Sequence, residues 1–214
     1  MPAVSTAPTP RRRRLAVADR RHELIDAALV LFSSQPADDV TLDDIARQAG
    51  VSRALAYRYF GNRADIYAEA MRRAADEFLT RLDPPRNGTP LARIVQAIHG
   101  YFDFAEEHAA GFQALLRGDP ASQAGAVGEI VAEVRAALFD RLVDGMGRRA
   151  ATPQLRLALH AWIAGAEAAG LDWLSHRDLD RQVVEDFLLD QLYNALAAVG
   201  RTDDDVATFL RGIS

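Results

Sequence analysis

Signals for the start of a helix recur along this chain, and they constrain its fold more than any other feature. Threonine followed by proline occurs at Thr89-Pro90 and at Thr152-Pro153, each time before a run whose apolar residues recur every three or four positions. Threonine is a good N-cap, and proline is tolerated at the first helical position because its missing N–H would have no partner there. No long segment alternates apolar and polar residues, as a half-buried strand would. The pattern predicts an all-α protein.

The expected helices form two groups, a set of short ones followed by a series of longer ones. Periodic apolar residues and capping signals place them at about 19–33, 42–49, 53–60, 62–81, 90–108, 110–116, 120–149, 153–176 and 180–199. Short helices bury little apolar surface alone and depend on packing against neighbours. We therefore expect an N-terminal domain of three helices over residues 18–78 and a larger helical domain over residues 79–214.

Residues 1–17 precede the first periodic segment and differ from it in composition. They combine proline, serine, threonine and alanine with four consecutive arginines, Arg11, Arg12, Arg13 and Arg14. This makeup is typical of a disordered basic arm. The arm is either a solvated tail or a segment that grips DNA through phosphates or the minor groove.

Composition excludes several classes of function. The chain has no cysteine, and all 25 basic residues are arginines, which removes disulfides, thiolate sites and lysine-based catalysis. The five histidines lack metal-ligand spacing with acidic neighbours, so we expect no metal, no cofactor and no enzyme activity. With a net charge of −5, a nucleic-acid partner must meet a local basic surface. No apolar run reaches membrane-spanning length and no secretory signal begins the chain, so we expect a cytoplasmic protein.

One stretch, TLDDIARQAGVSRALAYRYFGNRADIY from Thr41 to Tyr67, predicts a helix-turn-helix at residues 41–60. Thr41 and Asp44 form a variant of the capping box, and "AGVS" separates two short helices. The side chains expected to face inward are Ile45, Ala46, Ala49, Val51, Ala56 and Phe60. Those expected to face outward on the second helix are Arg53, Ala54, Leu55, Tyr57 and Arg58, with Tyr59 at the margin. Arginine and tyrosine suit phosphates and guanine, and small apolar groups suit thymine methyls.

This stretch closely resembles the DNA-binding domain of the TetR family of bacterial transcription regulators. The resemblance covers about residues 19–71 and rests on Thr41, "IA" at 45–46, "AGVS" at 49–52, "YRYF" at 57–60 and Asn62-Arg63. It implies that Thr41 and Ser52 cap helices and contact phosphates, and that Arg53, Ala54 and Leu55 lie nearest the bases. It also implies that Tyr57, Tyr59 and Arg63 bond the DNA backbone. Leu55 and Ala56 depart from the family's usual small hydroxyl residue and leucine, which leaves the operator open and implies looser helix packing.

The resemblance further implies a homodimer and a cavity for a small molecule in the C-terminal helices. Candidates for the dimer interface are Ala161, Gly165, Ala168, Phe187, Gln191 and Leu192. Candidates for the ligand pocket are Phe78, Tyr101, Phe102, Phe104, Phe112, Trp162 and Glu167. Residues at helical spacing are equally suited to the core of a single bundle, and Glu167 could be an ordinary surface or interface carboxylate.

The function that the resemblance implies is a dimeric repressor. It would bind a palindromic operator in double-stranded DNA, be released by a hydrophobic or amphipathic ligand, and lie in the bacterial cytoplasm, on the nucleoid when DNA-bound. An activator or a ligand-independent regulator of the same fold is the first alternative. A helical-bundle enzyme or carrier is the second, and it lacks a catalytic constellation, a phosphate-binding glycine loop and a metal motif in this sequence.

Overall fold

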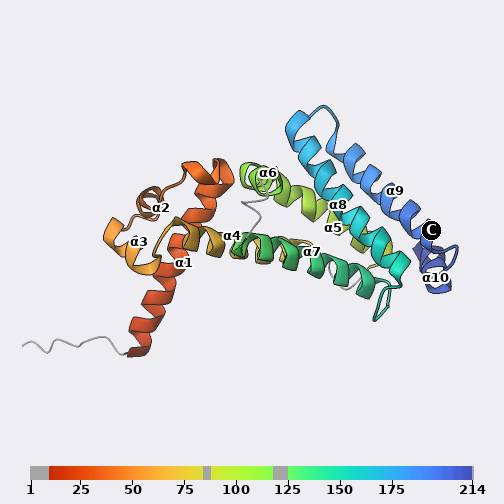
Figure 1. Ribbon diagram of the computed structural model, residues 1–214, viewed down its shortest axis with the longest axis horizontal. Helices are drawn as coiled ribbons and strands as arrows, with labels where there is room; N and C mark the ends of the chain where they lie inside the picture. Colours follow the sequence, from red (N-terminus) through yellow and green to blue (C-terminus); the bar gives the residue numbers. More distant parts are fainter. Residues whose placement is uncertain (1–9, 84–87, 118–124, 214) are drawn as a thin grey trace, which may run out of the picture. The chain divides into compact units, whose positions relative to one another are not determined.

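The computed structural model describes residues 10–83, 88–117 and 125–213, and all regular secondary structure in these ranges is helical (Figure 1). The prediction of an all-α fold is therefore confirmed. The helices are α1 (Pro10–Ser34), the 3-10 turn η1 (Ala37–Asp39), α2 (Leu42–Gln48), α3 (Arg53–Tyr59), α4 (Arg63–Arg81), α5 (Pro90–Glu107), α6 (Ala109–Arg117), α7 (Ala126–Gly145), α8 (Pro153–His176), α9 (Arg181–Val199) and α10 (Asp204–Ile213).

Several features of the helices differ from the sequence prediction. The first helix begins at Pro10, so residues 10–17 are helical where an arm was expected, because arginine and alanine are good helix formers. Residues 1–9 of that arm lie outside the described part. α7 begins at Ala126 instead of about residue 120, since Gly125 takes a non-helical conformation with φ +76°, and residues 118–124 lie outside the described part. It ends at Gly145 instead of continuing to about residue 149, since Gly147 takes a left-handed conformation with φ +71°. α10 was not predicted, although Asp203 and the i, i+3, i+4 spacing of Val206, Phe209 and Leu210 signal a short helix.

The helices divide into two compact units, the first ending at Arg73 and the second beginning at Ala74, inside α4. In the N-terminal unit, α1 supplies Leu24, Ala28 and Phe32 to a core that also holds residues of α2, α3 and α4. The inward residues expected of the helix-turn-helix are buried in the cases of Ile45, Ala46, Ala56 and Phe60, and half-buried for Ala49 and Val51. α2 packs against both α1 and α3, in agreement with the expectation that these short helices depend on packing against their neighbours.

The C-terminal unit is built around α8 and α9, which pack side by side (Figure 1). One core cluster contains Phe78, Phe102 and Trp173, and a second contains Leu155, Leu192 and Val206. Between α5 and α8, the Tyr101 hydroxyl donates to the carbonyl of Ala166 at 2.9 Å. Tyr101 also crosses Gly170 so closely that a Cβ there would lie 2.1 Å from its hydroxyl oxygen. Gly170 is therefore required by this close approach of α5 and α8.

Candidate DNA-reading surface and ligand-binding region

The turn between α2 and α3 depends on backbone geometry that the sequence specifies locally. Gly50 has φ +65°, a left-handed conformation that costs glycine little. The N–H of Gly50 donates to the backbone carbonyl of Arg47 at 3.1 Å, and the N–H of Val51 donates to the backbone carbonyl of Ala46 at 3.0 Å. These two hydrogen bonds end α2. Ser52 then begins α3, since its Oγ accepts the N–H of Leu55 at 3.2 Å. The "AGVS" segment is thus one helix end followed at once by one helix start.

The outward face of α3 carries four of the five side chains that were predicted to lie there, and Leu55 is the exception. Arg53, Ala54, Tyr57 and Arg58 are exposed, whereas Leu55 and Tyr59 are half-buried. The surface therefore presents two guanidinium groups and one phenol from a helix of two turns, and Tyr59 is partly used in packing. An exposed tyrosine between two arginines can donate to phosphates while the arginines reach phosphates or guanine.

The two capping hydroxyls differ in what they can offer to DNA. Thr41 forms the predicted capping box: its Oγ1 accepts the N–H of Asp44 at 3.2 Å, and the Asp44 carboxylate accepts the N–H of Thr41 at 3.1 Å. The Thr41 hydroxyl also donates to that carboxylate, so its proton is already engaged. Among the described residues no acceptor takes the Ser52 hydroxyl proton, so Ser52 can cap α3 and donate to an outside acceptor at the same time.

Two of the candidate arginines are held by acidic residues that the sequence analysis did not single out. Arg53 Nη2 lies 2.5 Å from Asp43 Oδ2, across from α3 to α2. Arg63 Nη2 lies 3.0 Å from Asp38 Oδ1, and its Nη1 donates to the carbonyl of Ala37 at 2.5 Å. Arg63 therefore ties the start of α4 to η1. The signal available in the sequence was the acidic segment "ADDVTLDD" next to this cluster of arginines.

The structure brings the aromatic candidates for a ligand pocket into one cluster in the C-terminal unit. Phe78, Tyr101, Phe102 and Phe104 are buried, and Phe112 and Trp162 pack against them partly exposed. The rings meet edge to face, with centroids 5.0 Å apart for Phe78 and Phe104. Trp162 Nε1 donates to the carbonyl of Leu188 at 2.9 Å. Edge-to-face contacts of this kind stabilise a core, and the structure shows these rings as part of one.

Glu167, the polar candidate for the pocket, is half-buried and has an arginine partner. Arg135 of α7 forms two hydrogen bonds to its carboxylate, from Nε at 2.8 Å and from Nη2 at 2.7 Å. Burial raises the pKa of Tyr101, and the negative charge of Glu167 raises it further, so Tyr101 remains a neutral donor. The polar groups beside the aromatic cluster are thus an ion pair and a phenol.

One group of possible metal ligands was missed because its members are far apart in the sequence. Glu77 of α4 and Glu107 and His108 near the end of α5 each place a ligand atom within 4.8 Å of the others. Arg81 reaches both carboxylates, at 2.5 Å from Glu77 and 2.6 Å from Glu107. The hydrogen bond from Arg81 lowers the pKa of Glu107. The positive charge that a cation would bring to these carboxylates is supplied by arginine.

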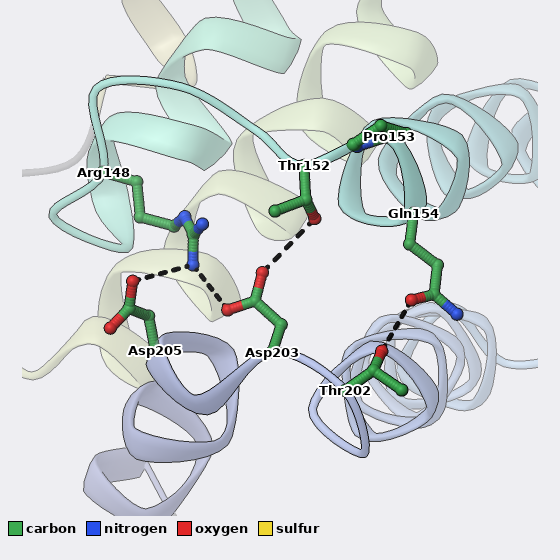
Figure 2. Close-up of a pocket in the computed structure, with 7 residues that line it drawn as sticks. All are labelled: Arg148, Thr152, Pro153, Gln154, Thr202, Asp203 and Asp205. Atoms are coloured by element: carbon green, nitrogen blue, oxygen red, sulfur yellow. Dashed lines mark hydrogen bonds and ion pairs between the residues drawn. The ribbon is translucent and has the colours of Figure 1, made fainter.

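Polar residues that line a hollow in the C-terminal unit fix the start of α10 through hydrogen bonds and ion pairs (Figure 2). Arg148 Nη1 lies 2.8 Å from Asp203, and Thr152 donates to the same carboxylate at 3.3 Å. Asp203 also accepts the N–H of Val206 in the first turn of α10 at 3.2 Å. Burial raises the pKa of Asp203, but these hydrogen bonds outweigh it and hold that pKa below its usual range. The charged side chains that line the hollow are paired with each other, which is typical of a structural role. We call Arg148, Thr152 and Asp203 the clasp of α10.

The outer side of α8 and α9 carries both small and large apolar residues. Ala161, Gly165 and Ala168 are exposed on α8, and Gln191 is exposed on α9. Phe187 is 52% exposed, whereas Leu192 is only 2% exposed and packs in the core of its own chain. Leu192 was therefore wrongly included among the interface candidates, because helical spacing alone does not separate the buried apolar residues of α9 from the exposed ones. The large apolar side chains exposed on these two helices are Leu157, Val183, Phe187 and Tyr193.

Comparison with known proteins assigns the family. Residues 24–70 match the family described as "Bacterial regulatory proteins, tetR family", and residues 90–195 match "Tetracyclin repressor-like, C-terminal domain". A transcriptional regulator BetI from Cronobacter sakazakii is 30% identical over 146 residues, which cover 66% of this chain and 72% of that protein. The chain belongs to the TetR family.

A second relative and a solved structure extend this result. The transcriptional activator FasR from Mycolicibacterium smegmatis is 25% identical over 145 residues, covering 65% of this TetR-family chain and 66% of FasR. The crystal structure of a TetR-family regulator from Streptomyces coelicolor has 34% identity and a TM-score of 0.85, covering 92% of this chain and 88% of that one. With its helix-turn-helix, the protein is a DNA-binding transcription regulator. No helix in the described ranges combines the length and apolarity needed to cross a bilayer.

Proposed function

We propose that this TetR-family protein is a dimeric repressor that binds a palindromic operator and is released by a hydrophobic or amphipathic small molecule. The observation that carries the proposal is the outward face of α3, where Arg53, Tyr57 and Arg58 are exposed on a capped helix of a helix-turn-helix. The protein acts in the cytoplasm without enzyme activity, cofactor or metal. Double-stranded DNA, a second copy of the chain and the ligand are its partners.

The DNA contacts depend on which groups of the helix-turn-helix are exposed. Arg53, Ala54 and Leu55 at the start of α3 face base edges in the major groove. Arg58 and the hydroxyls of Tyr57 and Tyr59 bind phosphates, and Ser52 donates to a phosphate while it caps α3. Thr41 and Arg63 exchange their present partners, Asp44 and Asp38, for phosphates when DNA is bound.

The dimer forms through α8 and α9. The exposed small residues of α8 let a second helix approach closely, and the exposed Phe187 offers apolar area that a second copy covers. A single helix-turn-helix reads too few base pairs to stand out among genomic sites. Two recognition helices about 34 Å apart read successive major grooves, and the operator then has two-fold symmetry.

Ligand release is a linkage between two binding sites in one molecule. A ligand that favours the form with altered spacing of the recognition helices weakens DNA binding by the same factor by which DNA weakens ligand binding. Moving the population from almost all bound to almost all free requires about 5.5 kcal/mol of differential affinity. The aromatic cluster around Tyr101 and Trp162 supports an apolar ligand, and Arg135 with Glu167 supports a polar end on it.

The first test is selection of bound sequences from randomised duplex DNA at a stated salt concentration. We expect a palindrome whose half-sites lie about one helical turn apart. Recovery of salt-sensitive background binding without a motif would contradict the proposal. A calorimetry and thermal-shift screen tests the ligand class, and it would contradict an apolar ligand if only strongly polar metabolites bound.

Activation is the second candidate for the output, since one relative of the chain, FasR, is named as an activator. The same α3 surface serves both outputs, and they differ in the effect of DNA binding on transcription. A reporter gene under the selected operator separates them. Deletion of the regulator raises expression in the case of a repressor and lowers it in the case of an activator.

A further inference from the structure

Asp43 of α2 is paired with the arginine that stands at the start of α3. Asp43 Oδ2 lies 2.5 Å from Arg53 Nη2. The arginine side chain is 73% exposed and the aspartate side chain only 28% exposed. The aspartate of the pair is therefore largely shielded from solvent, whereas the arginine is solvent-exposed and faces outward from the helix-turn-helix.

Asp43 is not required as the cap of its own helix. The capping box of α2 is made by Thr41 and Asp44, which share both of its reciprocal hydrogen bonds. The second carboxylate oxygen of Asp43, Oδ1, is buried and accepts no hydrogen bond within the described part of the chain. A buried acceptor without a donor is unfavourable. The interaction that the structure gives to this carboxylate is directed at Arg53.

We propose that Asp43 is a positioning residue for Arg53 and sets how strongly the protein discriminates its operator from other DNA. The inference rests on the proposed contact of Arg53 with a base edge. A guanidinium group has five donors on a planar fork. Asp43 occupies one nitrogen, Nη2, and leaves the remaining donors of the fork for an acceptor such as the O6 and N7 of guanine.

The pair affects specific and non-specific binding in opposite directions. A tethered arginine keeps the orientation needed for a bidentate contact and loses less side-chain freedom when it binds a base. The carboxylate also offsets the arginine charge that would otherwise bind any nearby phosphate. Phosphate contacts supply most of the affinity for non-specific DNA and make it salt-dependent. Asp43 therefore favours the operator over random DNA.

The test is Asp43→Asn, which keeps the size of the side chain and removes its charge. We expect non-specific affinity to rise, with the slope of log K against log salt steeper by about 1, because Arg53 becomes free to contact a phosphate. We expect the ratio of operator to random-DNA affinity to fall by roughly fivefold or more, within the range that a single bidentate base contact supplies. Asp43→Ser serves as a second variant, and thermal unfolding checks that both fold.

Loss of a negative charge near DNA would by itself strengthen non-specific binding, so the decisive measurement is a double-mutant cycle with Arg53→Ala. If Asp43 acts through Arg53, Asp43→Asn has no effect on the discrimination ratio in the Arg53→Ala background. An equal effect in both backgrounds would overturn the inference and leave Asp43 as a simple repulsive charge.

Two further arms separate this inference from the proposed function. Asp39→Asn removes the same charge from an exposed position in the same unit, and we expect it to leave the discrimination ratio unchanged. If Arg53→Ala alone leaves operator binding unchanged, the proposed base contact of Arg53 fails, and the inference fails with it. If Arg53→Ala weakens operator binding but Asp43→Asn leaves the ratio unchanged, only the positioning role of Asp43 is wrong.

Discussion

α3 of the N-terminal unit and α9 of the C-terminal unit both carry residues proposed to meet a partner, but they present them differently. α3 buries Ala56 and exposes Tyr57 and Arg58, so its inner and outer sides differ in chemistry. α9 buries Leu192 and exposes Phe187, so it carries large apolar residues on its buried and on its exposed side. A surface for DNA is polar and can be recognised from periodicity. A surface for a second copy of the chain resembles the core.

The largest expected effect compares a buried and an exposed apolar residue of α9. Leu192→Ala should lower the free energy of unfolding by about 2–5 kcal/mol, because it leaves a cavity in a packed core. Phe187→Ala should change the stability of a single protomer little and shift the monomer–dimer equilibrium toward monomer. Urea unfolding at low protein concentration measures the first effect and sedimentation equilibrium the second. Equal losses of protomer stability would mean that Phe187 belongs to the core and that the comparison fails.

The next effect compares two glycines on opposite sides of α8. Gly170→Ala should destabilise the C-terminal unit by about 1–3 kcal/mol, because its Cβ would meet the hydroxyl of Tyr101 at 2.1 Å. Gly165→Ala meets nothing within 4 Å and should raise helix stability by up to about 1 kcal/mol. Thermal unfolding at low protein concentration gives both values. If Gly165→Ala is instead the more damaging of the two, the outer side of α8 is not open in the protomer.

A third effect concerns the clasp of α10. The pKa of Asp203 is lowered in the folded protein, so its stabilising contribution is present above its ordinary pKa and is lost as pH falls through the folded value. At neutral pH, Asp203→Asn should cost about 1–3 kcal/mol, because Arg148 then loses a charged partner while only 14% exposed. The difference between wild type and variant should shrink below about pH 4. A constant difference across pH 3–7 would show that the charge of Asp203 does not contribute.

The sequence predicted the helices and the inner face of the helix-turn-helix because those features depend on neighbours a few positions away. The capping box of Thr41 and Asp44 and the buried Ala56 and Phe60 were found this way. Features that join distant segments were not found. The pair of Arg135 and Glu167 spans 32 positions, and no spacing rule links its members. The same holds for Asp203, whose partner Arg148 lies 55 positions away.

The candidate DNA surface shows the same limit at shorter range. Its exposed residues were predicted from periodicity, but the partners of its arginines were not. Asp43 and Arg53 are on different helices, and their contact depends on how α2 and α3 cross after the turn at Gly50. Exposure can be predicted from one helix alone, whereas an ion pair between helices requires the crossing geometry.

The smallest expected effect tests whether a local cap in the N-terminal unit behaves as the distant clasp of α10 does. The hydrogen bond from the Thr41 hydroxyl lowers the pKa of Asp44, so Asp44 also stabilises the fold above its ordinary pKa and loses that role in acid. Asp44 is the more exposed of the two carboxylates, with a side chain 29% exposed against 9% for Asp203, so solvent screens its interactions more. Asp44→Asn should therefore lower the thermal midpoint at pH 7 by less than Asp203→Asn does. At pH 3 the thermal midpoints of Asp44→Asn and wild type should converge. Asp39→Asn is the control for loss of an exposed carboxylate, and its difference from wild type should be small at both pH values. If Asp44→Asn proves the more damaging at pH 7, the short helix α2 depends on its cap more than α10 depends on its clasp, and local signals carry more of the stability of the N-terminal unit than packing does.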